Sequence, residues 1–353
     1  MLAAFSRLSD QIQITALAPT QGPLQQALQG LNVNHVPFAL RDQQGVKRTS
    51  ESLLREWNRT ANDYSIDLLH ANSLSMCRHL GRTASLLKIP ATGHIRDIMK
   101  LKPKAIRDLN SLAAVVAVSE ATRDFHVDQG LSDEACEVIY NGVDTDRFAP
   151  RQRTGYLHKE LGLPRHISLA ATIGQICLRK GQVDLAHAAA HIKVKFPDLH
   201  FLLIGQRHSA KAESIAYDEK IDAIFASAGI SHRLHRLGYR DDISQLLNEV
   251  DLLIHPARQE PLGRVLLEAA ASALPIVTTA VGGTSEILCD LDCEHLITPG
   301  EPSQLATAIQ RTLENVPESR RMAERMHNFV TQRFNIDNQS TALLRFWESK
   351  ANS

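Results

Sequence analysis

The sequence predicts an α/β protein with two doubly wound domains. Its 353 residues are more than one ordinary domain holds, and 43% of them are hydrophobic, which suffices for two cores. In the first half, short apolar runs alternate with amphipathic segments, a pattern typical of a parallel sheet covered by helices. We expect a first domain over residues 1–150, a second over residues 151–337, and a terminal helix over residues 338–353.

The apolar runs predict the strands of both domains. In the first domain they fall at residues 12–17, 33–38, 66–70, 90–94, 113–118 and 136–140. In the second domain they fall at residues 167–173, 199–204, 250–254 and 275–279, and amphipathic helices follow at residues 303–315, 319–334 and 340–350. The polar segment at residues 149–165 contains Pro150 and Pro164 and is expected to be the hinge.

Charge and cysteine content exclude several classes of partner. The 39 basic and 39 acidic residues give a net charge of zero, so no general field attracts nucleic acid. The five cysteines are scattered, and their odd number favours reduced thiols in a cytosolic protein. No apolar run is long enough to span a bilayer, and residues 1–20 lack the pattern of a signal peptide. We expect a cytoplasmic protein.

One segment, residues 255–288, concentrates the chemistry. The apolar run before it predicts a buried parallel strand, and Pro261 suits the first turn of the helix that follows, so this helix is expected to begin near Leu262. Its first N–H groups, around Gly263 and next to Arg264, form a positive end that favours a phosphate group or an oxyanion. An anionic ligand is therefore expected here.

Two carboxylates flank this positive end. Glu260 lies in the loop before the helix and Glu268 lies about one and a half turns inside it, so both can face one cleft. A second strand, at residues 275–279, leads to the run Gly282-Gly283-Thr284-Ser285. The glycines of this run allow backbone to approach a ligand, and its threonine or serine is expected to cap the next helix. Both strands end at the same edge of the sheet.

This combination resembles the donor site of retaining glycosyltransferases of family 4, which have the GT-B fold. The resemblance rests on two glutamates separated by seven residues, on Pro261-Leu262-Gly263-Arg264 between them, and on Gly282-Gly283-Thr284-Ser285-Glu286 after them. It covers nearly the whole chain and implies two Rossmann-like domains that face a cleft. In the family the last helix crosses back to the first domain.

The beginning of the chain departs from the family. Residues 12–19 resemble its second strand, so its first strand and glycine-rich loop have no counterpart. The first strand of a doubly wound sheet is central, and its absence leaves backbone groups of both neighbours unpaired. Either this domain is damaged or the natural chain starts upstream. We expect the reading frame to continue upstream of Met1 for roughly 20–30 residues.

The resemblance implies a donor site in the second domain. Glu268 is expected to accept from the ribose hydroxyls, and Glu260 to bind sugar hydroxyls or to lie near the developing positive charge. Lys180 matches the lysine that the family places on the diphosphate. The expected donor-binding residues are Gly174, Arg179, Leu262, Gly263, Arg264, Glu268, Gly282, Gly283 and Thr284.

One cation of the family's donor site is missing. Gln175 stands where the family has an arginine directly after the glycine of this loop. We expect Arg179 or Arg264 to compensate, because charge-assisted contacts to phosphate are strong.

In the first domain, three polar residues follow predicted strands. His94 lies where the family carries a histidine close to the transferred sugar, and it is expected to be catalytic together with Glu260 and Lys180. A capping or packing role is the alternative for His94. His70 and Asn72 are the expected acceptor-side residues.

No metal or cofactor is expected. Asp144 and Asp146 have the spacing of a metal-binding pair in a different glycosyltransferase fold, but this spacing is common and here lies in a turn. Cys289, Cys293 and His295 match no usual zinc pattern.

A basic segment at residues 96–107 has two interpretations. Its lysines and arginines are interleaved with apolar residues, as in a contact with anionic lipid or an acidic glycan. Alternatively it is a solvated helix face, because Pro103 interrupts the helix and acidic residues dilute the charge.

The residues and the resemblance together predict a glycosyltransferase. It is expected to move a hexose-type sugar from a nucleoside diphosphate sugar to a glycan, lipid-linked or small-molecule acceptor, with retention of configuration. The alternatives are a nucleotide-sugar epimerase of the same fold and a non-catalytic sugar-nucleotide binding protein, which a donor hydrolysis assay would separate. The protein is expected in the cytoplasm, with possible peripheral contact at the inner face of the membrane through residues 96–107.

Overall fold

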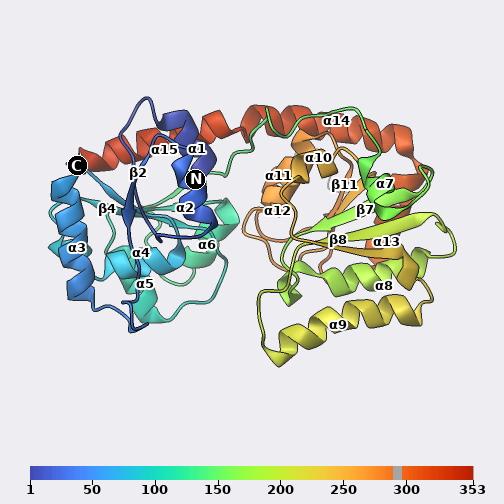
Figure 1. Ribbon diagram of the computed structural model, residues 1–353, viewed down its shortest axis with the longest axis horizontal. Coiled ribbons are helices and arrows are strands. Elements are labelled where there is room, and N and C mark those ends of the chain that lie inside the picture. The colour runs from blue at the N-terminus through green and yellow to red at the C-terminus, as the bar shows by residue number, and fades with distance from the viewer. Residues whose placement is uncertain (289–295, 353) are drawn as a thin grey trace. The chain divides into compact units, whose positions relative to one another are not determined.

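The computed structural model describes residues 1–288 and 296–352 and divides the chain into two compact units (Figure 1). Unit 1 comprises Met1–Gly142 and Ile336–Ser353, and unit 2 comprises Val143–Asn335. Both are α/β structures with parallel sheets, which confirms the predicted fold class.

The boundaries between the units differ from the predicted ones. Residues 143–150 belong to unit 2, and so does the expected hinge at residues 149–165, which contains the helix α7 (Tyr156–Leu161). The last helix, α15 (Ile336–Ala351), starts two residues before the predicted boundary at residue 338 and belongs to unit 1. Cys289, Cys293 and His295 lie outside the described residues.

The strands of unit 1 form two separate parallel sheets. Within residues 1–142, all of which are described, β1 pairs with β2, and the other four strands form a sheet in the order β3-β4-β5-β6. Each predicted strand of this part is present, with bounds that differ from the predicted ones by at most three residues: β1 (Thr15–Ala18), β2 (Asn34–Pro37), β3 (Leu69–Ala71), β4 (Ala91–Ile95), β5 (Ala114–Ala117) and β6 (Cys136–Val138).

Helices cover both faces of the four-stranded sheet. Alternate residues of β5 face opposite ways, so Ala114 and Val116 pack with α1 and α15, whereas Val115 and Ala117 pack with α3, α4 and α5. The helices of unit 1 are α1 (Leu2–Leu8), α2 (Pro23–Gln29), α3 (Ser50–Asp63), α4 (Leu74–Gly81), α5 (Pro103–Asn110), α6 (Glu120–Val127) and α15, with a 3₁₀ turn η1 (Ala84–Leu86).

Unit 2 is a doubly wound domain around one sheet. Its described strands run parallel in the order β12-β11-β10-β7-β8-β9, so the chain leaves β7 in one direction and returns to the other side of β7 at β10. Ligands of such folds bind at the carboxyl ends of the two strands where the direction reverses. The strands are β7 (Ser168–Ile173), β8 (Leu199–Ile204), β9 (Leu234–Gly238), β10 (Leu252–His255), β11 (Ile276–Thr279) and β12 (Leu296–Ile297).

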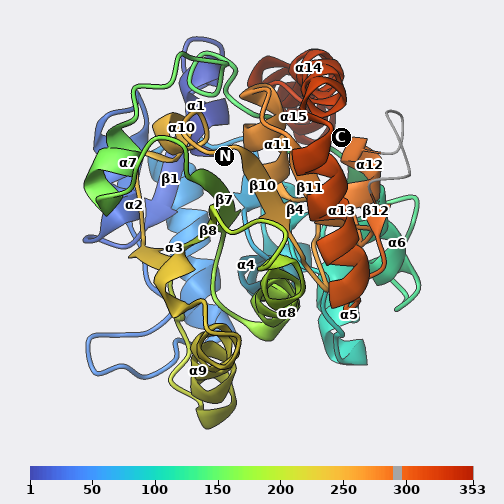
Figure 2. The same cartoon turned by 90° about the vertical axis from the view of Figure 1, so that its right-hand side faces the viewer.

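Helices lie on both faces of this sheet too (Figure 2). Leu252 and Ile254 of β10 pack into a core formed with α8, α9 and α13, so the alternation of the strand directs Leu253 and His255 to the opposite face. The elements are α8 (Gln182–Ile192), α9 (Ala212–Ser227), α10 (Ile243–Leu246), α11 (Arg264–Ala271), α12 (Thr284–Leu288), α13 (Pro302–Glu314) and α14 (Val316–Arg333), with 3₁₀ turns η2 (Leu178–Lys180) and η3 (Ser231–Arg233).

Gly263 and Pro103 define the starts of two helices. The helix α11 begins at Arg264, two residues after the expected start near Leu262, because Gly263 has a left-handed φ of 101° and ends the loop instead of continuing a helix. Pro261 therefore precedes the helix. In the basic segment, α5 begins at Pro103, so residues 96–102 do not share one helix face with residues 103–107.

None of the helices in the described residues is both long and apolar enough to cross a membrane.

Candidate active site

The site of unit 2 is built from two loops at the carboxyl ends of β7 and β10. The β7 loop (residues 174–181) ends at Gly181, whose φ is 68° and where a Cβ would overlap the carbonyl oxygen of Pro256 in the β10 loop (residues 256–263). Glycine therefore lets the two loops touch. The N–H groups of Arg258 and Gln259 donate to the carbonyl of Arg179, at 2.8 and 3.2 Å, and fix this contact.

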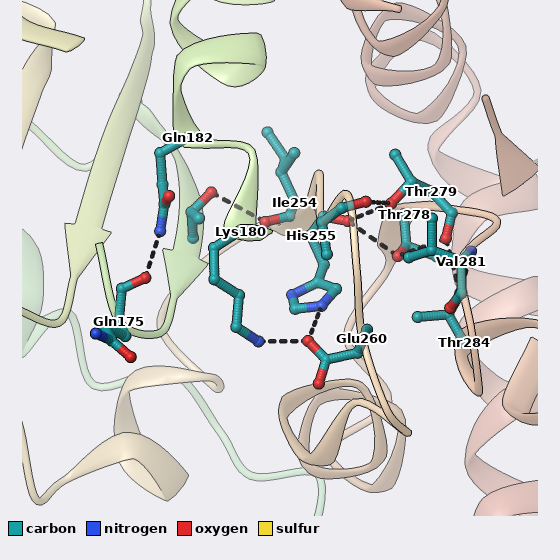
Figure 3. Close-up of polar contacts among 12 residues, drawn as sticks. Gln175, Lys180, Gln182, Ile254, His255, Glu260, Thr278, Thr279, Val281 and Thr284 are labelled. Carbon is teal, nitrogen blue, oxygen red and sulfur yellow. Dashed lines mark hydrogen bonds and ion pairs between the residues drawn. The ribbon is translucent and has the colours of Figure 1, made fainter. Parts of the chain in front are cut away.

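Lys180, Glu260 and His255 form the centre of the site (Figure 3). The ammonium of Lys180 donates to Oε2 of Glu260, and Nε2 of His255 donates to the same oxygen at 3.0 Å. The side chains of Lys180 and Glu260 are only 13% and 9% exposed, and His255 is 2% exposed. Water therefore screens this ion pair little.

The electrostatic balance keeps Glu260 ionised. Burial by itself raises the pKa of Glu260, but hydrogen bonds and charge from His255 and Lys180 lower it to about 2. Burial lowers the pKa of His255 more than Glu260 raises it, so His255 is neutral near pH 7. Its proton lies on Nε2, because a carboxylate oxygen only accepts.

Hydroxyl groups of β11 hold the backbone at His255 and just after it. Thr278 Oγ1 donates to the carbonyl of His255 at 3.0 Å, and Thr279 Oγ1 donates to the carbonyl of Ala257 (Figure 3). The N–H of Gly283 donates to the carbonyl of Glu260 at 3.2 Å. The loop that carries the carboxylate is thus attached to β11 and to the loop after it.

An ion pair between exposed Arg258 and buried Asp184 ties the β10 loop to the start of α8. The guanidinium of Arg258 donates to both carboxylate oxygens of Asp184, at 2.8 and 2.6 Å. Asp184 is buried, so a paired cation is required to compensate its lost hydration. The bidentate geometry also restricts the orientation of the loop.

The second carboxylate, Glu268, lies on α11. Its Oε1 accepts from Arg264 at 3.3 Å, and the side chains of Arg264 and Glu268 are 73% and 16% exposed. Burial raises the pKa of Glu268, opposed by the charges of Arg264 and Arg147. The Arg147 side chain, which donates to the carbonyl of Asp241, lies close enough to Glu268 for its charge to oppose the rise in the pKa of Glu268.

The glycine-threonine run after β11 is fixed by Thr284, the first residue of α12. Thr284 is fully buried, and its hydroxyl lies 2.8 Å from the carbonyl oxygens of both Thr279 and Val281, which share its proton, and accepts from the N–H of Val281 at 2.9 Å. Thr284 therefore fastens the loop that precedes α12. Since the N–H of Gly283 is bonded to Glu260, this part of the run supports the β10 loop.

The remaining expected donor residues are distributed around the Lys180–Glu260 pair. A Cβ on Gly174 would contact Cε of Lys180 at 3.6 Å, so this glycine borders the lysine stem. Leu262 of the β10 loop is buried, whereas Arg179 of the β7 loop is exposed. The carbonyl of Gln175 accepts from Gln182 at 2.9 Å.

The expected acceptor-side residues all lie in unit 1. The His70 and His94 rings meet edge to face with centroids 5.8 Å apart. Burial lowers the pKa of His70 to about 3 and that of His94 well below its ordinary value. Nδ1 of His94 accepts from Arg96 at 3.4 Å, and its Nε2 has no hydrogen-bond partner in the described residues. Asn72 is exposed just after β3.

The two aspartates that resembled a metal pair stabilise a turn. Oδ1 of Asp144 accepts from the N–H groups of Asp146 and Arg147, both at 3.1 Å. In residues 1–288 and 296–352, no three His, Cys, Asp or Glu side chains are grouped so as to hold a metal ion.

Two family profiles match the sequence one after the other. The profile described as "Glycosyltransferase Family 4" matches residues 4–147, and the profile described as "Glycosyl transferases group 1" matches residues 157–329. Both matches are to glycosyltransferase families, and the second domain of the chain is the part that matches the group-1 glycosyltransferases.

Curated glycosyltransferases are similar to the chain. The lipopolysaccharide glucosyltransferase WaaG of Escherichia coli (strain K12) is 30% identical over 214 residues, which are 59% of this chain and 54% of that protein. The D-inositol 3-phosphate glycosyltransferase of Corynebacterium aurimucosum is 26% identical over 268 residues, 74% of this chain and 61% of that protein. The chain thus spans between 54% and 61% of the length of these two relatives.

Solved glycosyltransferase structures share the fold. Anabaena HepE in complex with UDP and glucose matches with a TM-score of 0.84 and 23% identity, over 99% of this chain and 94% of that one. Sucrose-phosphate synthase from Thermosynechococcus elongatus matches with a TM-score of 0.80 and 16% identity, over 98% and 91% of the two chains. Both likenesses support the GT-B fold for this chain.

Several residues of the site were not expected from the sequence. His255 is the last residue of the apolar strand β10 and precedes Glu260 by five positions. A histidine at the carboxyl end of such a strand is the sequence signal that could have predicted its place in the site. The Arg258–Asp184 pair joins positions 74 apart and has no local signal. Arg147, which has no signal of its own in the sequence, lies near Glu268 only in the folded unit.

Proposed function

We propose that this protein is a group-1 glycosyltransferase that transfers a hexose-type sugar from a nucleoside diphosphate sugar to an acceptor hydroxyl, with retention of configuration. The observation that carries the proposal is the Lys180–Glu260 pair, which lies where doubly wound proteins bind their ligands. Relatives named for glucosyl and glycosyl transfer support the reaction class. HepE, solved with UDP-glucose, supports a nucleotide sugar as donor.

Lys180 and the start of α11 stabilise the departing diphosphate in this proposal. A leaving group that gains negative charge requires cations and oriented N–H groups, which act strongly where water is excluded. The ammonium of Lys180 is nearly buried, and the helix start after Gly263 presents backbone N–H groups. The exposed guanidinium of Arg264 adds a mobile charge beside them, and Arg179 is a second exposed cation.

The two glutamates have different roles. Glu268 binds the ribose hydroxyls, a contact that does not change during the reaction. Glu260, which is ionised and shielded from water, binds sugar hydroxyls or stabilises the positive charge that develops on the sugar. The loop glycines and Leu262 shape the pocket around them.

The acceptor is a glycan, a lipid-linked sugar or a small molecule that binds to unit 1, beside His94, His70 and Asn72. The exposed lysines Lys100, Lys102 and Lys104 support peripheral contact of the segment at residues 96–107 with the anionic inner face of a membrane. We propose a cytoplasmic location and a reaction that needs no metal ion.

A screen of nucleotide sugars tests the proposal. The purified protein is incubated with UDP-glucose, UDP-N-acetylglucosamine and GDP-mannose, and mass spectrometry measures bound ligands and products. We expect one donor to bind and to be slowly hydrolysed to the free sugar and the nucleoside diphosphate, with the activity lost in Lys180→Ala. NMR of the first sugar anomer released tests retention.

Two outcomes of this screen contradict the proposal. A protein that binds none of these donors is not a glycosyltransferase of the proposed specificity. Conversion of a donor into an epimer that still carries its nucleotide identifies an epimerase instead.

A further inference from the structure

Two donors share one carboxylate oxygen in the site of unit 2. Oε2 of Glu260 accepts from both Lys180 and His255. Under the proposed function, on which this inference rests, the donor's diphosphate attracts the ammonium of Lys180. Among the described residues, His255 is then the remaining side-chain donor to the Glu260 carboxylate.

We propose that His255 is a positioning residue, which holds the Glu260 carboxylate in place when Lys180 moves to the diphosphate of the donor.

The surroundings of His255 suit a partner that stays in place. His255 is the last residue of β10 and is 2% exposed. Its carbonyl accepts from Thr278 Oγ1, and the β10–β11 ladder pairs these same two residues. Lys180, by contrast, lies at the end of a four-carbon stem on a single 3₁₀ turn, so its ammonium can change partners by rotation about its own bonds.

The neutral imidazole of His255 also suits the role of partner to Glu260 once Lys180 has moved to the diphosphate. Removing one partner from a buried charge is costly, because the charge has lost its hydration. The charged groups near His255 are Glu260, Lys180 and Arg179, and burial keeps the imidazole neutral among them. A neutral N–H donor preserves the negative charge of Glu260 for the sugar, whereas a second fixed cation would neutralise it.

Two substitutions of His255 separate positioning from packing. His255→Leu removes the N–H group, whereas His255→Gln keeps one, because the amide nitrogen of glutamine lies about as far along the side chain as Nε2 of histidine. His158→Leu is the matched control, since His158 is another buried histidine of unit 2 and bonds through Nε2 to the carbonyl of Ile167 at 2.8 Å, just before the amino end of β7.

The readouts are the Kd for UDP, the kcat for UDP-glucose hydrolysis and the pH dependence of kcat. For His255→Leu we expect kcat to fall about tenfold or more at pH 7, the Kd for UDP to stay within about twofold, and the acidic limb of kcat to move to higher pH. His255→Gln is expected to recover kcat to within about threefold of wild type, and His158→Leu to leave the acidic limb unchanged.

The inference is overturned if His255→Leu leaves kcat and the acidic limb unchanged, or if UDP affinity falls as much as kcat. Failure of His255→Gln to recover any activity, while its melting temperature equals that of wild type, also overturns it. A wild-type protein that neither binds nor hydrolyses a nucleotide sugar contradicts the proposed function itself, and this result is read before any variant is compared.

Discussion

Lys180 and Glu260 form a nearly buried ion pair although 80 positions separate them in the chain. They meet because their loops follow β7 and β10, the two strands that become neighbours where the sheet order reverses. Gly181 allows the loops to touch, and the N–H groups of Arg258 and Gln259 hold them together by donating to the carbonyl of Arg179. The fold thus places a cation and a carboxylate at the position where a nucleotide sugar requires both.

Lys180→Ala is expected to weaken binding of UDP more than Arg179→Ala does. A buried charge-assisted contact contributes roughly 1.5–3 kcal/mol, which corresponds to a roughly 10- to 150-fold increase in Kd. Arg179 is exposed on the same turn, and its loss is expected to cost less than about threefold. Isothermal titration calorimetry at low and high salt measures both. A larger loss for Arg179→Ala would show that the lysine does not contact the diphosphate.

Glu268→Gln and Glu260→Gln are expected to affect different steps. Glu268 binds a group that the reaction leaves unchanged, so its substitution should raise the Kd for UDP and UDP-glucose alike. Glu260→Gln should leave the Kd for UDP within about twofold and lower kcat by about a hundredfold or more, because its charge acts in the transition state. Equal losses of UDP affinity in both variants would refute this division of roles.

Gln175→Arg is expected to strengthen donor binding. The substitution restores the cation that the resembling family carries after Gly174, and the backbone hydrogen bond from Gln182 to residue 175 is retained. We expect the Kd for UDP to fall several-fold, with an increased dependence on salt. Gln245→Arg, an exposed substitution on α10, is the control for a general change in charge. An unchanged Kd in Gln175→Arg would place the diphosphate away from this loop.

Local sequence patterns were sufficient to predict the strands and the loops of the site. Parallel strands buried on both faces are continuous apolar runs, and residues 199–204 became β8 with the predicted bounds. The glycine-bearing loops follow predicted strands directly, and Glu260 and Glu268 flank the helix after one of them. Their place in the sequence therefore predicted the carboxyl edge of the sheet. The strand β3 starts at Leu69 and not at Ile66, because Ile66 packs against the core without pairing in the ladder.

Interactions between distant positions were not predictable in this way. The start of α11 depends on the left-handed φ of Gly263, and glycine is compatible with either a cap or a continuing loop. The bonds from Thr278 and Thr279 to the backbone around His255 depend on the register of two strands. Neither the register nor the Arg258–Asp184 pair leaves a periodic signal in the chain.

The stability of the protein should decrease between pH 6.5 and pH 4 in part because of His200. Its Nδ1 shares a hydrogen bond of 2.8 Å with Nε2 of His235, and burial together with the charges of nearby histidines and Arg233 lowers the pKa of His200 to about 4. In the unfolded chain, His200 takes up a proton near pH 6.5. The contribution of neutral His200 to the free energy of unfolding is therefore complete above that pH and is lost as the pH falls through about 4.

Urea unfolding at pH 7 and pH 5 measures this effect. We expect the midpoint of His200→Gln to change less between the two pH values than that of wild type. His208→Gln, which replaces an exposed histidine, should behave like wild type. If His200→Gln keeps the full pH dependence, the buried histidine pair does not contribute to it.

Activity is expected to be insensitive to chelators. In the described residues, the aspartates with metal-like spacing are engaged in a turn through Asp144, and the proposed site uses Lys180 as its cation. Donor hydrolysis should be equal with and without EDTA. Loss of activity with EDTA, followed by recovery with manganese, would return Asp144 and Asp146 to consideration as metal ligands.

A crystal structure with UDP bound tests the central claim most directly. We expect the diphosphate between the β7 and β10 loops, within hydrogen-bond distance of Nζ of Lys180 and of the first N–H groups of α11, with the Lys180–Glu260 contact broken and the His255–Glu260 contact intact. A diphosphate bound elsewhere, or a Lys180 ammonium that remains on Glu260 in the complex, would contradict the account.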